Sequence, residues 1–285
     1  MGEVTLAQEI ADAYRRYLEA TFHFKDPELR ASFSQALERS YLVKGPYLEA
    51  TPRFKRGATP RALFQQLLGK PMPDAIIRSL HGDRPLYKHQ EQAISQASAG
   101  KNVVVATGTG SGKTEAFLYP ILLHLYLQHT AGKLASGVRA LILYPMNALA
   151  NDQRDRLRET AGRLKREGAP FRFTFGQYIG ETPEDEKDRR RRAPELLADR
   201  ERGGDSTVEN GQVLHGELVL RSEMRRTPPH ILLTNYSMLE YLLLRPSDSP
   251  LFDDGQATWW TFLVLDEAHQ YRGHVASKWL CFCGG

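Results

Sequence analysis

Apolar and polar positions follow two different patterns along residues 84–285. Short apolar runs predict β-strands, which we place at 102–106, 139–144, 171–178, 231–234 and 261–266. Between them, apolar residues recur at helical spacing, which predicts helices at 90–99, 113–128, 147–167, 183–200 and 237–244. Strands that alternate with helices form a mostly parallel sheet with helices on both faces. The predicted fold class is therefore α/β.

Residues 1–83 show only the helical pattern. We expect them to form a helical N-terminal extension to a main domain at 84–285. One apolar face joins Val4, Ala7, Ile10, Ala11, Tyr14 and Leu18. Asp26 followed by Pro27 predicts the start of a second helix. The remaining segments are an extended linker and two short helices, predicted at 43–60, 61–68 and 74–80.

Two segments of the main domain interrupt this alternation. Thr182-Pro183 predicts a helix cap and a first turn, and the helix that follows carries acid-before-base pairs and the arginine run 189–192. This run is either a solvated helix face or a contact to a phosphate backbone, and both interpretations stay open. Alternating apolar residues around Gly216 predict an inserted β-hairpin at 212–221.

The composition is that of a globular protein, with 41% apolar and 25% charged residues among 285. A net charge of +4 is compatible with nucleic acid as a partner. No run of 18 apolar residues and no signal-peptide core occurs, so we expect no membrane segment and a cytoplasmic location. Cys281 and Cys283 indicate no disulfide framework. With His274 they make half of a metal site, because a full site needs about four ligands.

A glycine-rich segment stands between the strand predicted at 102–106 and the helix predicted at 113–128. Its residues are Thr107, Gly108, Thr109, Gly110, Ser111, Gly112, Lys113, Thr114 and Glu115. Glycines let backbone N–H groups curl around a phosphate, and the helix start adds partial positive charge. In such a loop Lys113 reaches the outer phosphates and Thr114 holds Mg²⁺. The strict pattern has glycine where this chain has Thr107, and a turn without a ligand is the alternative.

Two adjacent carboxylates end the last predicted strand, where the sequence reads Asp266-Glu267-Ala268-His269. Acids at the end of an apolar strand are costly unless a cation or a substrate binds there. We therefore expect Asp266 to bind Mg²⁺ through its water shell, and Glu267 to orient and deprotonate an attacking water. His269 is expected near the terminal phosphate. The alternative is a surface loop that carries two acids.

Together these motifs resemble those of the superfamily 2 DEAD/DEAH-box helicases, and further segments strengthen the resemblance. Residues 86–94 match the adenine-reading Q motif, in which Gln90 meets the adenine edge and Tyr87 stacks nearby. Residues 144–153 match motif Ia, and residues 232–239 match motif Ib. More narrowly, the chain resembles the large bacterial DEAD/DEAH-box proteins, including those of Druantia-type phage-defence systems and the related MrfA-type DNA repair helicases.

The resemblance implies a RecA-like domain that binds ATP and Mg²⁺ and contacts the backbone of nucleic acid, with DNA favoured over RNA. The backbone contacts that it implies are Pro145, Asn147, Gly180, Thr234 and Asn235. Such motors also have a second RecA-like domain, whose motifs, like motif III, do not occur in this sequence. We expect a partner to supply that domain, or the chain to be a fragment that has lost it.

Three functions agree with these patterns. The first is the ATP-binding half of a DNA helicase or translocase. The second is a nucleic-acid-binding fragment that binds nucleotide without turning it over. The third is the motor module of a restriction or phage-defence complex, although no nuclease motif is visible in the sequence.

Overall fold

The computed structural model describes two compact units, residues 1–53 and residues 54–285. The residues it describes are 3–40, 42, 53–108, 110–192, 208–209, 212–213, 216–252 and 260–271. Within these ranges, no helix is both long enough and apolar enough to cross a membrane.

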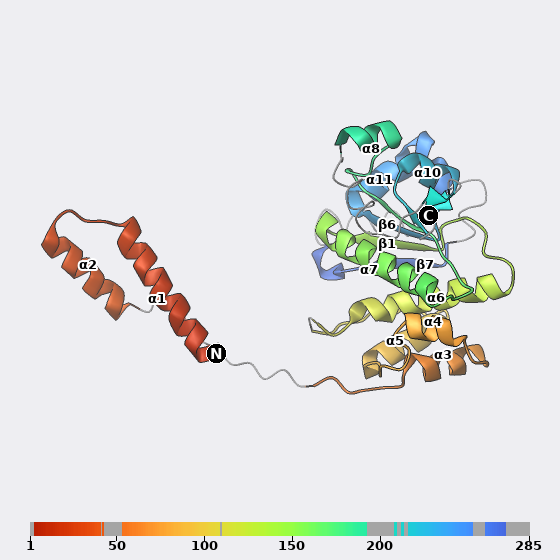
Figure 1. Cartoon of the computed structure of the whole chain (residues 1–285), viewed down its shortest axis with the longest axis horizontal. Helices are drawn as coiled ribbons and strands as arrows, with labels where there is room; N and C mark the ends of the chain where they lie inside the picture. The colour runs from red at the N-terminus through yellow and green to blue at the C-terminus, as the bar shows by residue number, and fades with distance from the viewer. Residues whose placement is uncertain are drawn as a thin grey trace. The chain divides into compact units, whose positions relative to one another are not determined.

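The first unit consists of two helices, α1 (Glu3–Thr21) and α2 (Pro27–Arg39), drawn in red and orange-red in Figure 1. The carboxylate of Asp26 accepts two backbone hydrogen bonds from the first turn of α2, at 2.8 and 3.2 Å, which caps the helix where the sequence predicts a start. Phe33 makes edge contacts with Phe22 and Phe24 across the connecting turn. These aromatic contacts hold the two helices as a hairpin.

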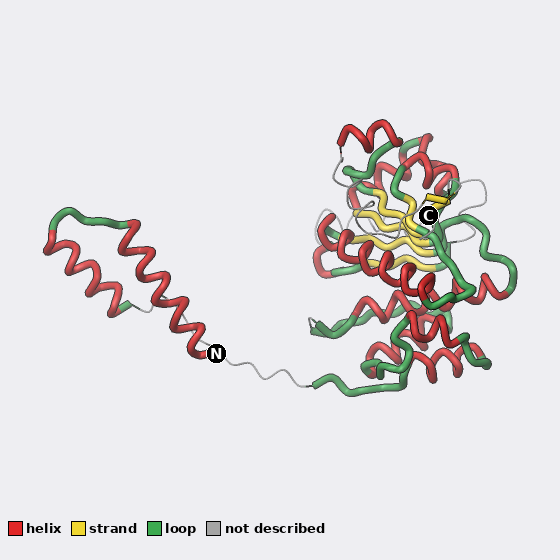
Figure 2. The backbone as a smooth tube through the Cα atoms, viewed as in Figure 1, coloured by secondary structure: helices red, strands yellow, loops and turns green. Residues whose placement is uncertain are grey.

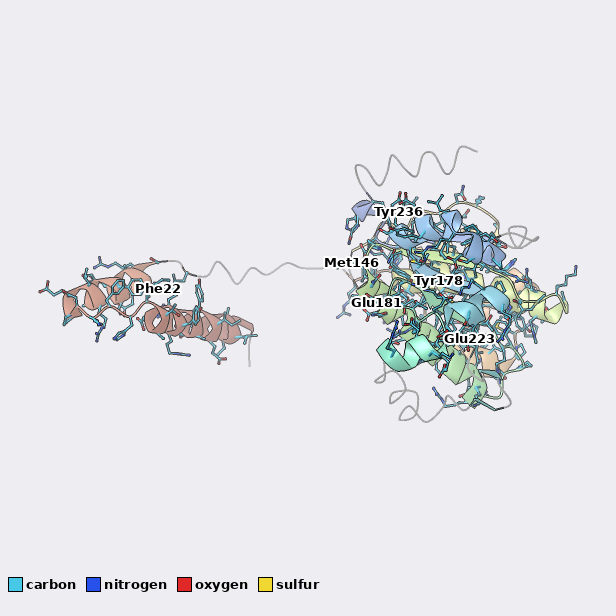
Figure 3. The ribbon with its side chains drawn as sticks, turned by 90° about the horizontal axis from the view of Figure 1, so that it is seen from above. Phe22, Met146, Tyr178, Glu181, Glu223 and Tyr236 are labelled. Carbon is cyan, nitrogen blue, oxygen red and sulfur yellow. The ribbon has the colours of Figure 1, made fainter. Side chains whose placement is uncertain are left out.

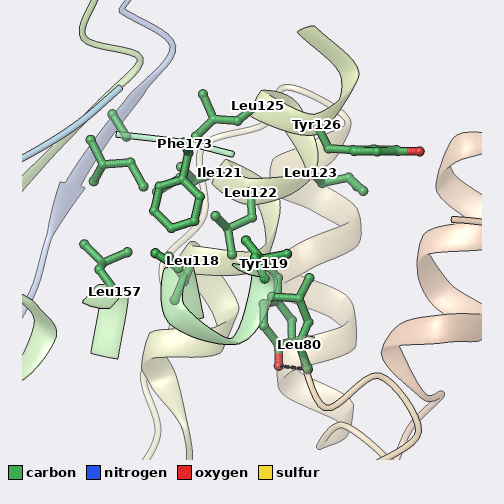
Figure 4. Packing of buried hydrophobic residues seen from close by; sticks show 14 of the residues in the cluster. Leu80, Leu118, Tyr119, Ile121, Leu122, Leu123, Leu125, Tyr126, Leu157 and Phe173 are labelled. Carbon is green, nitrogen blue, oxygen red and sulfur yellow. Dashed lines mark hydrogen bonds between the residues drawn. The ribbon is translucent and has the colours of Figure 1, made fainter. Parts of the chain in front are cut away.

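Three helices open the second unit, α3 (Pro60–Leu68), α4 (Asp74–Ser79) and α5 (Lys88–Ser98). They share one hydrophobic core with the long helix α6 (Lys113–Thr130). Figure 4 shows this packing, including the hydrogen bond of 2.8 Å that the Tyr119 hydroxyl donates to the carbonyl of Leu80. Residues 54–83 thus contribute to the core of the second unit, and the boundary expected at residue 83 falls inside it.

The sheet of the second unit has five strands, β1 (Ala140–Tyr144), β2 (Phe175–Tyr178), β5 (Glu217–Leu218), β6 (Ile231–Asn235) and β7 (Phe262–Leu265). Their order is β5-β2-β6-β1-β7, and every pairing is parallel. In β1, Ala140 lies opposite Ile231 on one side and Phe262 on the other. The predicted parallel α/β fold is confirmed.

Helices cover both faces of this sheet, as Figure 2 shows in red around the yellow strands. Besides α6 they include α7 (Asn147–Arg166), α10 (Arg221–Arg226), α11 (Tyr236–Leu244) and the 3-10 helix η1 (Pro246–Leu251). Ala140 and Ile142 of β1 belong to the core with α6 and α7, whereas Leu141 and Leu143 belong to a second core with α10, α11 and η1. The strands are therefore apolar on both faces, which is typical of a buried parallel sheet.

The prediction of a strand at 102–106 is wrong, because these residues pair with no described strand. Val103 and Val104 are 39% and 93% exposed. A strand needs a neighbour to satisfy its backbone N–H and C=O groups. The apolar sequence predicts a strand here, but regular structure also requires a partner strand.

The hairpin predicted at 212–221 also needs correction. A short antiparallel pair does form, but from β3 (Val208–Glu209) and β4 (Gln212–Val213). The next strand, β5, joins the edge of the main sheet beside β2 instead of the hairpin. In this position β5 is hydrogen-bonded to β2, a buried strand of the main sheet, which a local hairpin would not provide.

The helix predicted at 183–200 forms only as α8 (Glu186–Arg192): residues 183–185 precede it without helical structure, and residues 193–200 lie outside the described residues. Thr182 does not cap it, because its hydroxyl oxygen accepts a bond of 2.9 Å from the N–H of Ile179, and the hydroxyl donates to the carbonyl of Gln177 at 2.8 Å, which closes the turn after β2. Asp185 instead accepts a bond of 2.8 Å from the N–H of Asp188. Within the arginine run, Arg191 pairs with Asp188 at 3.1 Å.

Candidate nucleotide and nucleic-acid site

The carboxyl ends of the parallel strands bring the predicted motifs to one edge of the sheet. Motif Ia follows β1, Gly180 follows β2, Asn235 ends β6 and Asp266 follows β7. In the order β2-β6-β1-β7, the three segments expected to contact nucleic acid follow the neighbouring strands β2, β6 and β1. The two acids follow β7, which lies on the other side of β1. Parallel α/β sheets bind their ligands at this edge.

The phosphate loop enters α6 through two glycines in the left-handed conformation, Gly110 with φ 72° and Gly112 with φ 71°. Gly112 is the last residue before the helix, so Lys113 and Thr114 stand in its first turn. The N–H groups of a first helical turn have no partner inside the helix and can bind an anion. Thr109 of the loop lies outside the described residues.

Two side chains brace the phosphate loop. The hydroxyl of Thr107 lies 2.6 Å from that of Ser111, and the imidazole of His89 lies 2.9 Å from the Ser111 carbonyl. Thr107 stands where the strict pattern has glycine. The structure gives this departure a physical role, because the threonine hydroxyl closes the loop onto Ser111.

Replacing Gly112 by alanine should weaken nucleotide binding at least tenfold. A Cβ there would lie 2.3 Å from Nε2 of Gln90 and 2.8 Å from the Glu115 carboxylate. The left-handed backbone costs a residue with a side chain about 1–2 kcal/mol more. Titration with a fluorescent ATP analogue measures the effect. The matched control is Gly162→Ala inside α7, where the Cβ meets only the mobile end of Arg166; equal affinities of the two variants would contradict the loop geometry.

The Q-motif glutamine, Gln90, is only 5% exposed. Its Oε1 accepts a bond of 2.7 Å from the N–H of Tyr87, and its Nε2 donates to the Gly112 carbonyl at 2.8 Å and to the Glu115 carboxylate at 3.4 Å. Gln90 thus caps its own helix and ties it to the phosphate loop. Contact with adenine would require Gln90 to exchange these bonds. Tyr87 stacks on His89, with ring centroids 5.7 Å apart.

Asp266 follows β7 and interacts electrostatically with the phosphate loop. Burial raises the pKa of the Asp266 carboxyl, and the Glu267 carboxylate adds to this, whereas the Glu267 N–H at 3.0 Å and the charge of Lys113 lower it. Lys113 and Asp266 belong to two sequence motifs about 150 residues apart. A half-buried carboxyl whose charged form is disfavoured gains from a nearby cation.

Glu267 has a left-handed backbone with φ 49°. Such a conformation costs a residue other than glycine about 1–3 kcal/mol and is found mostly at functional sites. The short 3-10 helix η3 (Ala268–Gln270) follows, and within it the imidazole of His269 lies 3.3 Å from the Glu267 carboxylate. The bend therefore turns Glu267 out of the strand line and brings it against His269.

Thr114 and Asp266 are the side chains that fit the expected Mg²⁺. The described residues contain no cluster of three His, Cys, Asp or Glu side chains able to hold a metal ion. Magnesium in nucleotide sites is held by one or two protein groups together with phosphates and water. One hydroxyl and one half-buried carboxylate therefore suit a cation that arrives with a nucleotide. The half metal site considered at Cys281, Cys283 and His274 lies outside the described residues.

Three residues of the nucleic-acid motifs form one hydrogen-bonded chain, which we call the amide bracket: Glu181, Asn147 and Asn235. Nδ2 of Asn147 donates to both carboxylate oxygens of Glu181 at 3.1 Å, and its Oδ1 accepts from Nδ2 of Asn235 at 2.8 Å. Oδ1 of Asn235 accepts a bond of 2.7 Å from the N–H of Met238 and caps α11. The bracket thus fixes the starts of α7 and α11 and the turn after β2 relative to one another.

No described side chain caps the start of α7, which lies in the amide bracket. The residue before the helix, Met146, is 58% exposed. Figure 3 labels Met146, Glu181 and Tyr236 along one edge of the second unit. Open N–H groups at this helix start can bind phosphate oxygens.

The other predicted contacts differ in exposure. Thr234 is fully buried, and its hydroxyl donates to the Tyr178 carbonyl at 2.6 Å, so it stabilises the turn after β2 from within the core. Gly180 is exposed, and a Cβ there would meet nothing within 4 Å. Pro145 is half-buried after β1. Arg221, which no motif indicates, donates to the Gly180 carbonyl at 3.1 Å and shapes this turn.

The order and spacing of these motifs agree with a family comparison. Residues 87–210 match the family model of the DEAD/DEAH box helicases. The chain carries a DEAD/DEAH-box helicase domain. Residues 87–94 of the Q motif, the phosphate loop and motif Ia fall inside the matched range, and the two acids follow it.

This helicase domain is similar to two curated bacterial proteins. The Druantia protein DruE of Escherichia coli (strain UMEA 4076-1) is 32% identical over an alignment that covers 93% of this chain and 18% of DruE. The uncharacterized ATP-dependent helicase YprA of Bacillus subtilis (strain 168) is 27% identical, over 73% of this chain and 22% of YprA. The chain therefore spans about a fifth of the length of these relatives.

A solved structure supports the fold of the helicase domain. The DEAD-box helicase Mss116 bound to ssRNA and UDP-BeF aligns with a TM-score of 0.51 and 18% identity, over 81% of this chain and 38% of that chain. At this identity the likeness concerns the fold alone. It confirms the RecA-like architecture that the sequence predicts.

Proposed function

We propose that this domain is the ATP-binding and nucleic-acid-binding part of an ATP-dependent DNA helicase or translocase. The observation that carries the proposal is the shared sheet edge. There Asp266 and Glu267 follow β7 beside β1 on one flank, the amide bracket lies on the other, and Thr114 of the phosphate loop contacts Gln153 of α7. A motor that steps along nucleic acid needs the nucleotide site and the nucleic-acid site on one rigid domain, so that a conformational change at one site alters binding at the other.

The residues at the ATP site divide the work by chemistry. Backbone N–H groups of the phosphate loop bind phosphates, and Lys113 neutralises their outer charge. Thr114 and Asp266 hold the magnesium ion, which supplies charge stabilisation on the phosphates when bound. Glu267 orients the attacking water and accepts its proton. On the family resemblance, a second RecA-like domain, for example from a partner, completes the site.

Nucleic acid is proposed to bind by its backbone at the open start of α7 and at the turn of Gly180. The side chains of Asn147 and Asn235 hold these backbone groups in place, since their amides bond each other and Glu181. Contacts to phosphates carry no sequence information, so binding should be independent of sequence. DNA is favoured over RNA on the family resemblance.

Fluorescence anisotropy with labelled single-stranded DNA tests this proposal. The wild type should bind several unrelated DNA sequences with similar affinity, and RNA of the same sequence should compete less well. Asn147→Ala should weaken binding about tenfold, because it breaks the amide bracket at its contacts with Glu181 and with Asn235, where each hydrogen bond is worth about 1 kcal/mol. Glu159→Gln, on the same helix and paired with Arg163 in its turn, is the control. A wild type that binds no nucleic acid would refute the proposal.

A further inference from the structure

One face of α7 contacts the first turn of α6. Nε2 of Gln153 donates to Oγ1 of Thr114 at 3.2 Å, and the guanidinium of Arg156 lies 3.4 Å from the Glu115 carboxylate. Gln153 and Arg156 are three residues apart, so they emerge from the same side of the helix. The helix that begins in the amide bracket therefore touches the phosphate loop within its first turns.

The contacts of Arg156 and of Gln153 differ in their energetic contribution. The side chains of Arg156 and Glu115 are 50% and 30% exposed, so solvent screens their attraction and the ion pair contributes little. Gln153 is half-buried, and its partner is the hydroxyl that the proposed function assigns to magnesium. The contact between Gln153 and Thr114 is thus the one with a direct consequence for the nucleotide.

The chemistry of a hydroxyl gives this contact its meaning. A threonine oxygen has two lone pairs and one O–H, and its orientation is set by the groups that bond it. The N–H of Gln153 occupies one lone pair of Thr114. The second lone pair is then free to meet a cation, and the O–H remains able to donate. Without Gln153 the hydroxyl can rotate, and a cation must first fix it.

We propose that Gln153 is a positioning residue for the Thr114 hydroxyl, and that α7 thereby couples binding of the magnesium nucleotide to binding of nucleic acid at the amide bracket. This inference rests on the proposed function and names a regulation of the same site. The single helix α7 carries both Asn147 of the amide bracket and Gln153, which contacts Thr114, so it links the two sites physically. Binding at either end must then affect the other end by the same factor.

The first test measures ATP affinity of the full chain with Mg²⁺ and with EDTA. Gln153→Met keeps the side-chain length and removes the donor. It should leave the EDTA affinity unchanged and reduce the gain in affinity from Mg²⁺ about fivefold, as expected for one hydrogen bond. The matched control is Glu159→Met on the same helix. An equal loss in both buffers, or an unchanged gain from Mg²⁺, would overturn the positioning role.

The second test measures ATP affinity with and without single-stranded DNA. The factor by which DNA changes ATP affinity in the wild type should move about fivefold towards one in Gln153→Met, and should stay unchanged in Glu159→Met. An unchanged factor in Gln153→Met would overturn the link through α7. Circular dichroism and thermal unfolding of each variant confirm that it folds. A wild type that binds no ATP would refute the proposed function itself. That result differs from the two outcomes for Gln153→Met that would overturn only the positioning role or the link through α7.

Discussion

Glu267→Gln is expected to bind ATP as the wild type does and to lose about 10²–10⁴-fold in ATP turnover. Glutamine has nearly the shape of glutamate, so it fits the same bent backbone after β7. Its amide cannot accept a proton from water. Asp266 and Lys113 stay in place, so nucleotide and magnesium should still bind. Calorimetry measures ATP binding. Phosphate release measures turnover, and it is assayed on the assembly that hydrolyses ATP together with a second RecA-like domain.

The control for this variant is Glu159→Gln, which makes the same chemical change on an exposed position of α7. It should keep full turnover. Turnover by Glu267→Gln within a few-fold of the wild type would show that Glu267 is not the group that activates water. Loss of ATP binding in this variant would assign Glu267 to binding instead of chemistry.

The free energy of unfolding of the second unit should fall by about 2 kcal/mol as the pH drops from 6.5 to 5, because of His230. Burial lowers the pKa of His230 from 6.5 to about 4, with the charge of Arg139 acting in the same direction. Nδ1 accepts a bond of 2.9 Å from the N–H of Thr174, so this nitrogen carries no proton, and Nε2 donates to the Ala135 carbonyl at 3.2 Å. Protonation at Nδ1 would break the bond to Thr174.

The sign follows from proton counts. Between pH 6.5 and 4 the unfolded chain binds a proton at His230 that the folded chain does not, so stability decreases as the solution is acidified. Burial also lowers the pKa of His124, which adds to the slope. Urea unfolding at a series of pH values measures the effect. A His230→Gln variant should show a clearly smaller slope over this window, and an identical slope would contradict the assignment.

Much of the fold follows from local sequence, because the strands β1, β6 and β7 are short apolar runs, α5 and α7 have apolar residues at helical spacing, and α6 is a long, mostly apolar segment. Local sequence fails where structure depends on distant partners. Residues 102–106 are as apolar as a strand but have no described neighbour, and β5 joins β2 instead of the hairpin before it. Thr182 is a good cap by residue type, yet its hydroxyl is used by the turn after β2.

The candidate site divides in the same way. Lys113, Asp266 and Glu267 are predicted from sequence, because phosphate and metal chemistry needs a lysine at a helix start after a glycine-rich loop and carboxylates at a strand end. Gln153 and Glu181 carry no such signal, because their roles arise only when α7 meets α6 and the turn after β2. Even Gln90, which the sequence singles out, makes internal bonds that no motif reveals.

Binding of ATP by residues 1–285 with Mg²⁺, with and without single-stranded DNA, tests the central claim most directly when Lys113→Ala is measured beside the wild type. The control is Lys101→Ala, an exposed lysine outside the loop. The wild type and Lys101→Ala should bind ATP equally, and Lys113→Ala should bind about 10- to 100-fold more weakly, as expected for the loss of one charge-assisted contact. Equal ATP binding by Lys113→Ala and the wild type would contradict the assignment of the phosphate loop.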